Sequence, residues 1–190
     1  MREPFMLSFP LDEYRARLDK LIAIMQRDGI DAAIFTSDNN TFYFTGFQSI
    51  VWGSKVSTPG VVVVTADGGL ALCTTRGGVE TAKVTSLVED IRYTGAGGYP
   101  TLAECIASVL ADRKLLSGRI GLELGYGHKL HFNYANQQAM FHELRDAQIV
   151  DLSEQLWQLR GVKSPREIER MREASRINSR AIEKLSLIHI

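Results

Sequence analysis

The sequence has no long hydrophobic run that could cross a membrane. Its apolar stretches are short, such as the GVVVV of Gly60–Val64, whereas a membrane-spanning helix needs ~20 apolar residues. The amino-terminal MREPFMLSFP lacks the apolar core and the small-residue cleavage site of a signal peptide. We therefore expect no membrane as a partner and no secretion.

Cysteine is also scarce, with two in the whole chain. Cys73 falls in a strand-like run and Cys105 in a helix-like one, and no Cys-x-x-Cys spacing occurs. We interpret both cysteines as small, buried apolar residues and not as part of a disulfide framework or a metal site. A reducing, cytoplasmic location fits this pattern.

Neither charge is in excess, because 22 basic residues balance 22 acidic ones. The electrostatic footprint of a nucleic-acid partner or of an anionic membrane surface is therefore missing. The apolar fraction of 45% and the charged fraction of 23% are those of a globular protein. A chain of 190 residues corresponds to one domain with a little to spare.

Helical and strand patterns alternate along the chain. The predicted helices are 11–27, a short 41–44 after a turn or cap at 37–40, 79–84, 101–116, 131–144 and 153–160. The predicted strands are 31–36, 60–65, 70–75, 90–93, 119–124 and 148–151, of which the second and third form a hairpin. This order predicts an α/β domain: a mixed sheet of about six strands with helices on both faces.

The stretch LRGVKSPREIERMREAS marks a boundary near residue 160. Ser164 and Glu167 have capping-box spacing, and Pro165 stands at the first helical position. Apolar residues then recur at helical spacing to about Leu185. We expect a domain over 1–160 and, over 161–190, a linker and the start of a helix. Two interpretations stay open: a terminal helix packed on its own domain, or a helix that connects to a further domain.

No complete catalytic constellation is visible. His128 and His131 could share a metal with Glu123, but the glycines around them indicate a loop, so solvated histidines are the better interpretation. The Gly-rich 95–98 lacks the spacing of a phosphate-binding loop, and no Gly-x-Ser-x-Gly occurs. We expect no catalytic residue, no metal site and no cofactor in this chain.

Several separated pieces nevertheless form one pattern. They are Glu13-Tyr14 with Arg17, Gly29–Ile34, Asn40 with Tyr43–Phe47, Ile120–Glu123, Val150-Asp151, and Arg160–Ile168. In this order and spacing, from about Phe9 to Ile182, the chain resembles the N-terminal domain of the creatinase, prolidase and aminopeptidase P family. The tract from Arg160 to Ile168 is the most specific, because in that family it leads into the catalytic domain.

The resemblance implies that a catalytic domain of "pita-bread" fold follows the last helix, outside this sequence. In the family's peptidases that domain carries two metal ions, Mn or Co, whereas creatinase works through a histidine without metal. The intact parent is then expected to hydrolyse a C–N bond, most simply an Xaa-Pro peptide bond, and this chain alone is expected to be inactive. Residues 185–190 break the charged pattern and are a candidate non-native tail. The alternative is a stand-alone binding or assembly module.

The resemblance also implies a role in subunit association, with a homodimer expected, and a loop that covers the neighbouring active site. That loop corresponds to Phe47–Pro59 here. Where creatinase offers an aromatic residue and an arginine to its substrate, this chain has Trp52 followed by Ser54 and Lys55. Trp52 is an aromatic wall suited to a proline ring or a small amine; its alternative role is a partly buried loop anchor. Asn40 and Tyr43 are interpreted as structural, Asn40 tying its turn to the backbone.

Overall fold

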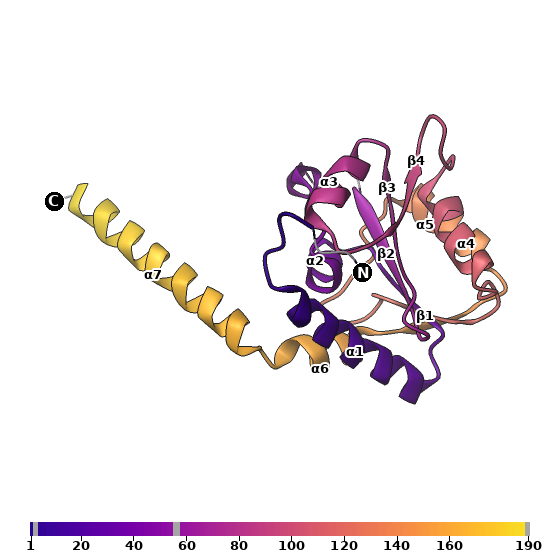
Figure 1. The fold of residues 1–190 in the computed structure, drawn as a ribbon, viewed down its shortest axis with the longest axis horizontal. Helices are drawn as coiled ribbons and strands as arrows, with labels where there is room; N and C mark the ends of the chain where they lie inside the picture. The colour runs from indigo at the N-terminus through magenta and orange to yellow at the C-terminus, as the bar shows by residue number, and fades with distance from the viewer. Residues whose placement is uncertain (2–3, 55–57, 189–190) are drawn as a thin grey trace. The chain divides into compact units, whose positions relative to one another are not determined.

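A six-stranded sheet organises the larger part of the chain (Figure 1). The computed structural model describes residues 1, 4–54 and 58–188. It divides into two units, Met1–Leu159 and Arg160–Ile190. The first contains the sheet with its covering helices, and the second contains the last helix.

The predicted alternation of strands and helices is confirmed. The strands are β1 (Ala32–Phe35), β2 (Gly60–Thr65), β3 (Leu70–Thr75), β4 (Asp90–Thr94), β5 (Arg119–Leu122) and β6 (Gln148–Asp151). The helices are α1 (Leu11–Asp28), α2 (Asp38–Thr45), α3 (Gly78–Thr85), α4 (Leu102–Asp112), α5 (Tyr134–Glu143), α6 (Ser153–Gly161) and α7 (Pro165–Ile188). A 3₁₀ helix, η1 (Ile50–Ser54), lies within the predicted loop.

The sheet is mixed, with the strand order β4-β3-β2-β1-β5-β6. β2 runs antiparallel to both β1 and β3, while β1, β5 and β6 are mutually parallel and β3 is parallel to β4. Five strands therefore share one direction, and their carboxyl ends meet at one edge of the sheet. The β2–β3 hairpin closes through Ala66–Gly69, where Gly68 has the positive φ of 90° that the turn requires.

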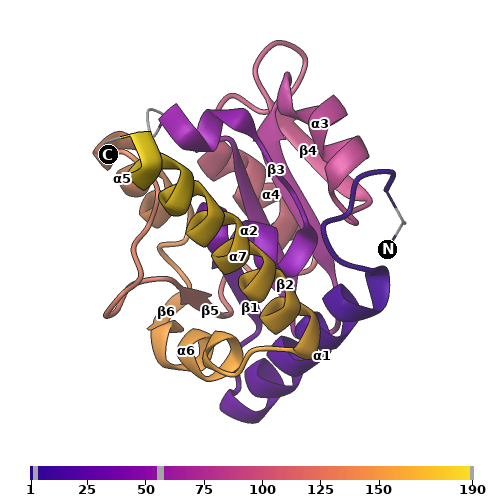
Figure 2. The same ribbon diagram turned by 90° about the vertical axis from the view of Figure 1, so that its left-hand side faces the viewer.

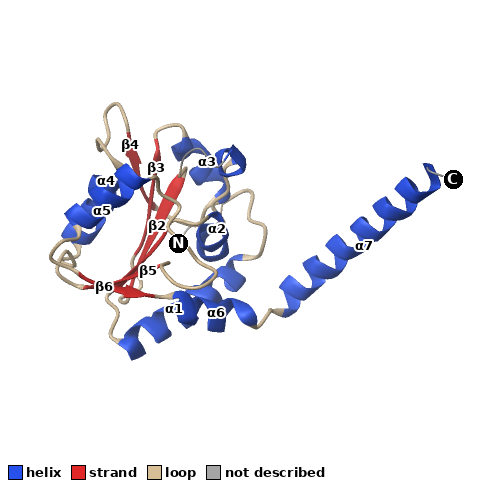
Figure 3. Cartoon of the chain, turned by 180° about the vertical axis from the view of Figure 1, so that it is seen from behind, coloured by secondary structure: helices blue, strands red, loops and turns tan. Residues whose placement is uncertain are grey.

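Two apolar cores cover the two faces of the sheet, as the views in Figures 2 and 3 show for the helices of this unit. One face packs α1, α2 and α6 against the side chains of Phe35, Val62 and Leu72. The other packs α4 and α5 against Ile34, Val63 and Ile120. β2 is buried along its whole length because both its faces are covered.

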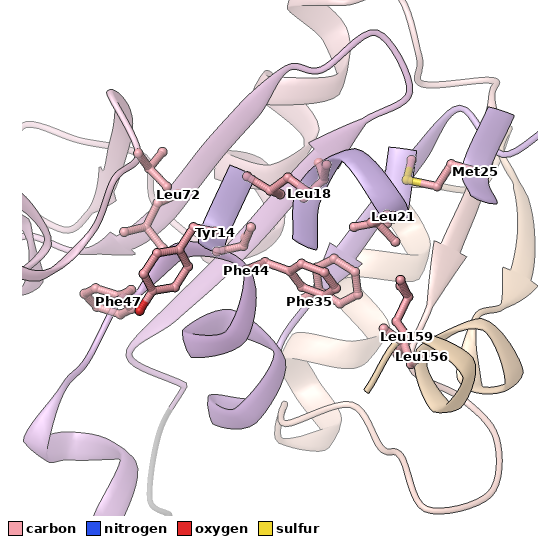
Figure 4. Close-up of a cluster of buried hydrophobic side chains, with 14 of the residues drawn as sticks. Tyr14, Leu18, Leu21, Met25, Phe35, Phe44, Phe47, Leu72, Leu156 and Leu159 are labelled. Atoms are coloured by element: carbon pink, nitrogen blue, oxygen red, sulfur yellow. The ribbon is translucent and has the colours of Figure 1, made fainter. Parts of the chain in front are cut away.

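The α1 side of the sheet is rich in aromatic rings (Figure 4). Phe35 and Phe44 stack with their ring centroids 4.8 Å apart, a geometry that adds stability beyond apolar burial alone. Arg17 is buried on α1 and lies over the rings of Phe9 and Tyr43, at 4.5 Å and 4.3 Å. It also donates to the Tyr43 carbonyl at 3.1 Å, so α1 and α2 are joined at this corner.

Capping residues explain where the helix boundaries differ from the predictions. α2 begins at Asp38 rather than Thr41 because Ser37 caps it, accepting from the Asn40 N–H at 3.3 Å. α5 begins at Tyr134 rather than His131 because Asn133 accepts from the Asn136 N–H at 2.9 Å. α4 ends at Asp112, before the expected Leu116, since Lys114 has a φ of 58° that cannot continue a helix.

The second unit consists of the end of α6, a short connection and α7. The predicted capping box is confirmed: Glu167 N–H donates to Ser164 Oγ at 3.1 Å, and Ser164 N–H donates to Glu167 Oε2 at 2.8 Å. Along α7 an exposed apolar stripe recurs at helical spacing. Its members are Ile168, Met171, Ile177, Ile182 and Leu185.

Candidate functional site

The carboxyl-end edge of the sheet carries the loops that could form a site. The segment before β2, the turn before α2, the start of α3 and the connection from β5 to α5 all meet there. In open α/β sheets this is the edge at which ligands bind. The predicted loop, Phe47–Pro59, lies on it.

Both ends of the loop Phe47–Pro59 are fixed. Gly46, with a φ of 75°, ends α2, and the buried Phe47 donates its N–H to Thr45 Oγ1 at 3.2 Å. At the other end, the Pro59 carbonyl accepts from Thr74 Oγ1 at 2.5 Å. Between these points Ile50 is 97% exposed. The two ends of the loop are therefore held to α2 and β3.

Trp52 is half-buried in η1 and meets a histidine. Its ring lies edge-to-face with that of His131, with centroids 6.4 Å apart and an interplanar angle of 85°. The indole Nε1 is buried and has no hydrogen-bond acceptor among the residues that the structure describes. Ser54 ends η1, but its side chain lies outside the described residues, and so does the whole of Lys55. Of the three predicted site residues, Trp52 alone has a described environment.

A buried carboxylate lies at the same edge of the sheet. Glu123 is 0% exposed at the end of β5. Oε2 accepts from Thr36 N at 2.7 Å, Thr36 Oγ1 at 3.1 Å and Ser37 N at 3.0 Å. Oε1 accepts from Ser37 Oγ and from Asn40 Nδ2, each at 2.5 Å. The carboxylate therefore fastens the end of β5 to the β1–α2 turn.

Asn40 is structural, as predicted. Its side chain donates to the Glu123 carboxylate, a partner that the sequence did not identify. Tyr43 is structural as predicted, although its ring packs beneath the Arg17 guanidinium. In the sequence, Glu123 was a possible metal ligand and part of the family resemblance, and nothing in the local pattern identified its hydrogen-bond partners.

The two histidines are held by different aromatic rings. His131 meets Trp52, while His128 meets Trp157 with centroids 5.5 Å apart. The Trp157 Nε1 donates to the Tyr126 carbonyl at 2.9 Å, which closes the β5–α5 connection onto α6. Within residues 1, 4–54 and 58–188, no group of three His, Cys, Asp or Glu side chains is placed to hold a metal ion. The described residues therefore do not fit a dinuclear metal centre.

Asp151 stabilises the same connection from β6. Its Oδ1 accepts from the N–H groups of Leu124, Gly125 and Ser153 and from Ser153 Oγ, at 2.6–3.1 Å. Burial alone would raise the pKa of this carboxyl, but the hydrogen bonds from Ser153 and from the two backbone amides outweigh it and lower the pKa below its usual value. Asp151 is therefore a structural anion.

The two cysteines lie in the core on the α4 side of the sheet, both fully buried and free. A hydrogen bond with Cys105, together with burial, raises the pKa of the Cys73 thiol well above its usual value. Such a thiol is unreactive. The Gly-rich 95–98 forms a tight turn, in which Gly98 N–H donates to the Gly95 carbonyl at 2.9 Å. No helix in the described part of the chain is both long and apolar enough to cross a membrane.

An open groove runs beside the loop Phe47–Pro59. Its volume is about 840 Å³, and it lies between η1, the end of β3 and the start of α3. The lining is polar and small on the α3 side, through Thr75, Gly78 and Thr81, and apolar on the η1 side, through Ile50 and Val51.

Curated proteins resemble this chain over most of its length. The chain is 26% identical over 182 residues to an ectoine hydrolase of Halomonas elongata, covering 90% of this chain and 43% of that protein. It is 29% identical over 164 residues to an uncharacterized peptidase, YqhT, of Bacillus subtilis, and this match covers 85% of this chain and 40% of that protein. The chain thus spans about two fifths of the length of these curated relatives.

Solved structures agree on the fold. An Xaa-Pro dipeptidase from Bacillus anthracis superimposes with a TM-score of 0.71 at 21% identity, over 93% of this chain and 44% of that one. The model of the Creatinase/Prolidase N-terminal domain matches residues 17–162. The chain therefore belongs to the family of creatinase and prolidase N-terminal domains.

Proposed function

We propose that this chain is the non-catalytic N-terminal domain of a C–N hydrolase, and that it covers the active site of a neighbouring subunit. The observation that carries the proposal is the loop Phe47–Pro59, fixed at both ends, with Trp52 held against His131. The coverage of about two fifths of the relatives supports a further domain after α7. That absent domain supplies the chemistry, including any pair of Mn or Co ions.

The parent's substrate is proposed to be an Xaa-Pro peptide. The peptidase relative and the dipeptidase of the same fold support this choice. A flat indole offers a large apolar face to a proline ring, and the polar residues Ser54 and Lys55 follow Trp52 in the sequence. The role of Trp52 is to bind and orient the substrate and to exclude water.

Complementation between subunits tests the covering role. One subunit of the full-length parent carries Trp52→Ala, and the other carries an inactivated catalytic domain. If the loop serves the neighbouring subunit, a mixed dimer has one site with an intact Trp52 and an intact catalytic domain, and hydrolysis of an Xaa-Pro dipeptide returns. The matched control is Tyr134→Ala, which removes an exposed aromatic side chain on α5. This substitution should leave the hydrolytic activity of the full-length parent unchanged.

Two results would contradict the proposal. Undiminished activity of the pure Trp52→Ala parent excludes a substrate role for this residue. Loss without recovery in the mixed dimer means that the loop serves its own subunit. A panel of Xaa-Pro dipeptides, creatine and ectoine decides the substrate class, and an open reading frame that stops at residue 190 would favour a stand-alone assembly module instead.

A further inference from the structure

Glu123 presents a problem that the covering role does not by itself explain. It is a fully buried carboxylate at the end of a central strand, and its five hydrogen bonds from described residues all come from neutral groups. Burying a carboxylate without a cation costs free energy that an apolar side chain of the same volume would not. Fully satisfied buried polar groups are better explained by the geometry they impose.

The hydrogen bonds of Glu123 connect it, through Thr36 and His131, to the loop that carries Trp52. Thr36 Oγ1 donates to Glu123 Oε2 at 3.1 Å and accepts from the His131 N–H at 2.9 Å. One hydroxyl therefore connects the buried carboxylate to the backbone of the residue whose ring meets Trp52. A hydroxyl group has a single O–H to donate, so the hydrogen bond to Glu123 sets the orientation of the Thr36 hydroxyl.

His131 is fixed from its other side by the end of the same loop. The Thr58 hydroxyl donates to the His131 carbonyl, and Thr58 is buried just before Pro59. His131 is thus bound through its N–H to the sheet and through its carbonyl to the loop, while its ring lies edge-to-face with Trp52. The backbone of a single residue joins the two segments.

We infer that Glu123 and Thr36 are positioning residues, which set the orientation of Trp52 through the backbone of His131. This inference rests on the proposed covering function and names the residues that prepare the loop for it. A ligand-binding aromatic ring must be held within a narrow range of positions, and a fixed surrounding shell supplies that constraint. Glu123 touches neither substrate nor Trp52, so its effect is indirect.

Fluorescence of Trp52 in the present chain tests the inference. The chain has two tryptophans, so a Trp157→Phe background leaves Trp52 as the sole indole. Thr36→Val keeps the shape of the side chain and removes the hydroxyl, whereas Thr36→Ser keeps the hydroxyl. Acrylamide quenching should rise in Thr36→Val towards the value of a free indole and should stay at the background level in Thr36→Ser.

A second pair of variants separates positioning from general destabilisation. Glu123→Gln preserves the shape but turns one acceptor into a donor that faces donors, so quenching should rise as in Thr36→Val. Leu18→Ala weakens the core at α1 without removing a hydrogen bond of this network, and should leave quenching of the folded protein unchanged. Unfolding of each variant in urea confirms that the native state is being measured.

The outcomes are distinct. Unchanged quenching in Thr36→Val overturns the inference, and so does an equal rise in Leu18→Ala or in Thr36→Ser. In the full-length parent, Thr36→Val should raise KM for an Xaa-Pro dipeptide with little loss of kcat, and Thr36→Ser should restore it. If Trp52→Ala leaves the parent fully active, the covering function fails while the quenching results still decide whether Thr36 orients Trp52.

Discussion

At the scale of single residues, burial changes the acid–base behaviour of Tyr14. Its side chain is 0% exposed on α1. Burial raises the pKa of the phenol to about 12, against a smaller opposite effect of the Arg17 guanidinium. Since the pKa is higher in the folded state than the usual value of 10.0, folding keeps the phenol protonated where the unfolded chain loses its proton.

The sign of the resulting pH dependence follows directly. The free energy of unfolding is unaffected by Tyr14 below about pH 10 and falls as the pH rises from about 10 to 12, by roughly 2–3 kcal/mol. Urea unfolding at pH 8 and pH 11.5 should therefore show a larger loss in the wild type than in Tyr14→Phe. Equal losses in the two proteins would mean that Tyr14 does not contribute.

At the scale of elements, two glycines end helices in the left-handed conformation but differ in their surroundings. Gly29 ends α1 with a φ of 64°, and a Cβ added there would meet nothing within 4 Å. Gly46 ends α2 with a φ of 75°, and its Cβ would lie 2.9 Å from the Thr85 carbonyl oxygen. Gly46 is also the residue from which the loop Phe47–Pro59 begins.

This difference gives a matched pair of substitutions. Gly29→Ala should lower the free energy of unfolding by about 1–2 kcal/mol, through backbone strain alone. Gly46→Ala should cost about 1–3 kcal/mol more, because the added methyl group meets backbone that cannot move aside. Chemical denaturation of both variants measures the difference, and equal losses would contradict the close approach at Gly46.

Local chemistry explains which elements could be predicted. The capping box of Ser164 and Glu167 and the β2–β3 hairpin depend on residues a few positions apart, and the structure contains both. The helix start at Asp38 was missed because the turn or cap predicted at 37–40 left open that Ser37 is the cap, and the start at Tyr134 was missed because Asn133 was not recognised as the cap. The 3₁₀ helix η1 has no strong sequence signal.

The surroundings of the candidate site could not be predicted in the same way. Glu123 meets Thr36 and Asn40, which lie 87 and 83 positions away, and only the pairing of β1 with β5 brings them together. Trp52 was identified through the family resemblance, whereas its contact with His131 required the fold. Long-range pairings of this kind leave no periodic signal in the sequence.

At the scale of the whole molecule, the apolar stripe on α7 predicts self-association of this chain. Five apolar side chains along an otherwise charged helix are exposed, and each would gain about 1.5–3 kcal/mol from full burial. A two-fold dimer buries such a surface on both copies at once. We expect a dimer at high micromolar concentration, through α7 or through the loop Phe47–Pro59.

Light scattering measures the oligomeric state of the wild-type chain and of a double variant with Met171→Glu and Ile182→Glu. Loss of the dimer in the variant places the contact on α7, and a dimer that persists moves it to the loop Phe47–Pro59. A strictly monomeric wild type would contradict the expectation. Arg180→Glu, on the charged side of α7, serves as a control with the same total change of charge.

The position of β1 in the sheet has a consequence for the order of folding. β1 pairs on one side with β2 and on the other with β5, from which it is separated by residues 36–118. The β2–β3 hairpin can close within microseconds, but joining β5 to β1 closes a far longer loop and comes late. On the ribosome, β1 stays an open edge until β5 has emerged. The Glu123 carboxylate reaches its partners only at that step, so the loop carrying Trp52 acquires its final orientation only after β5 has joined β1.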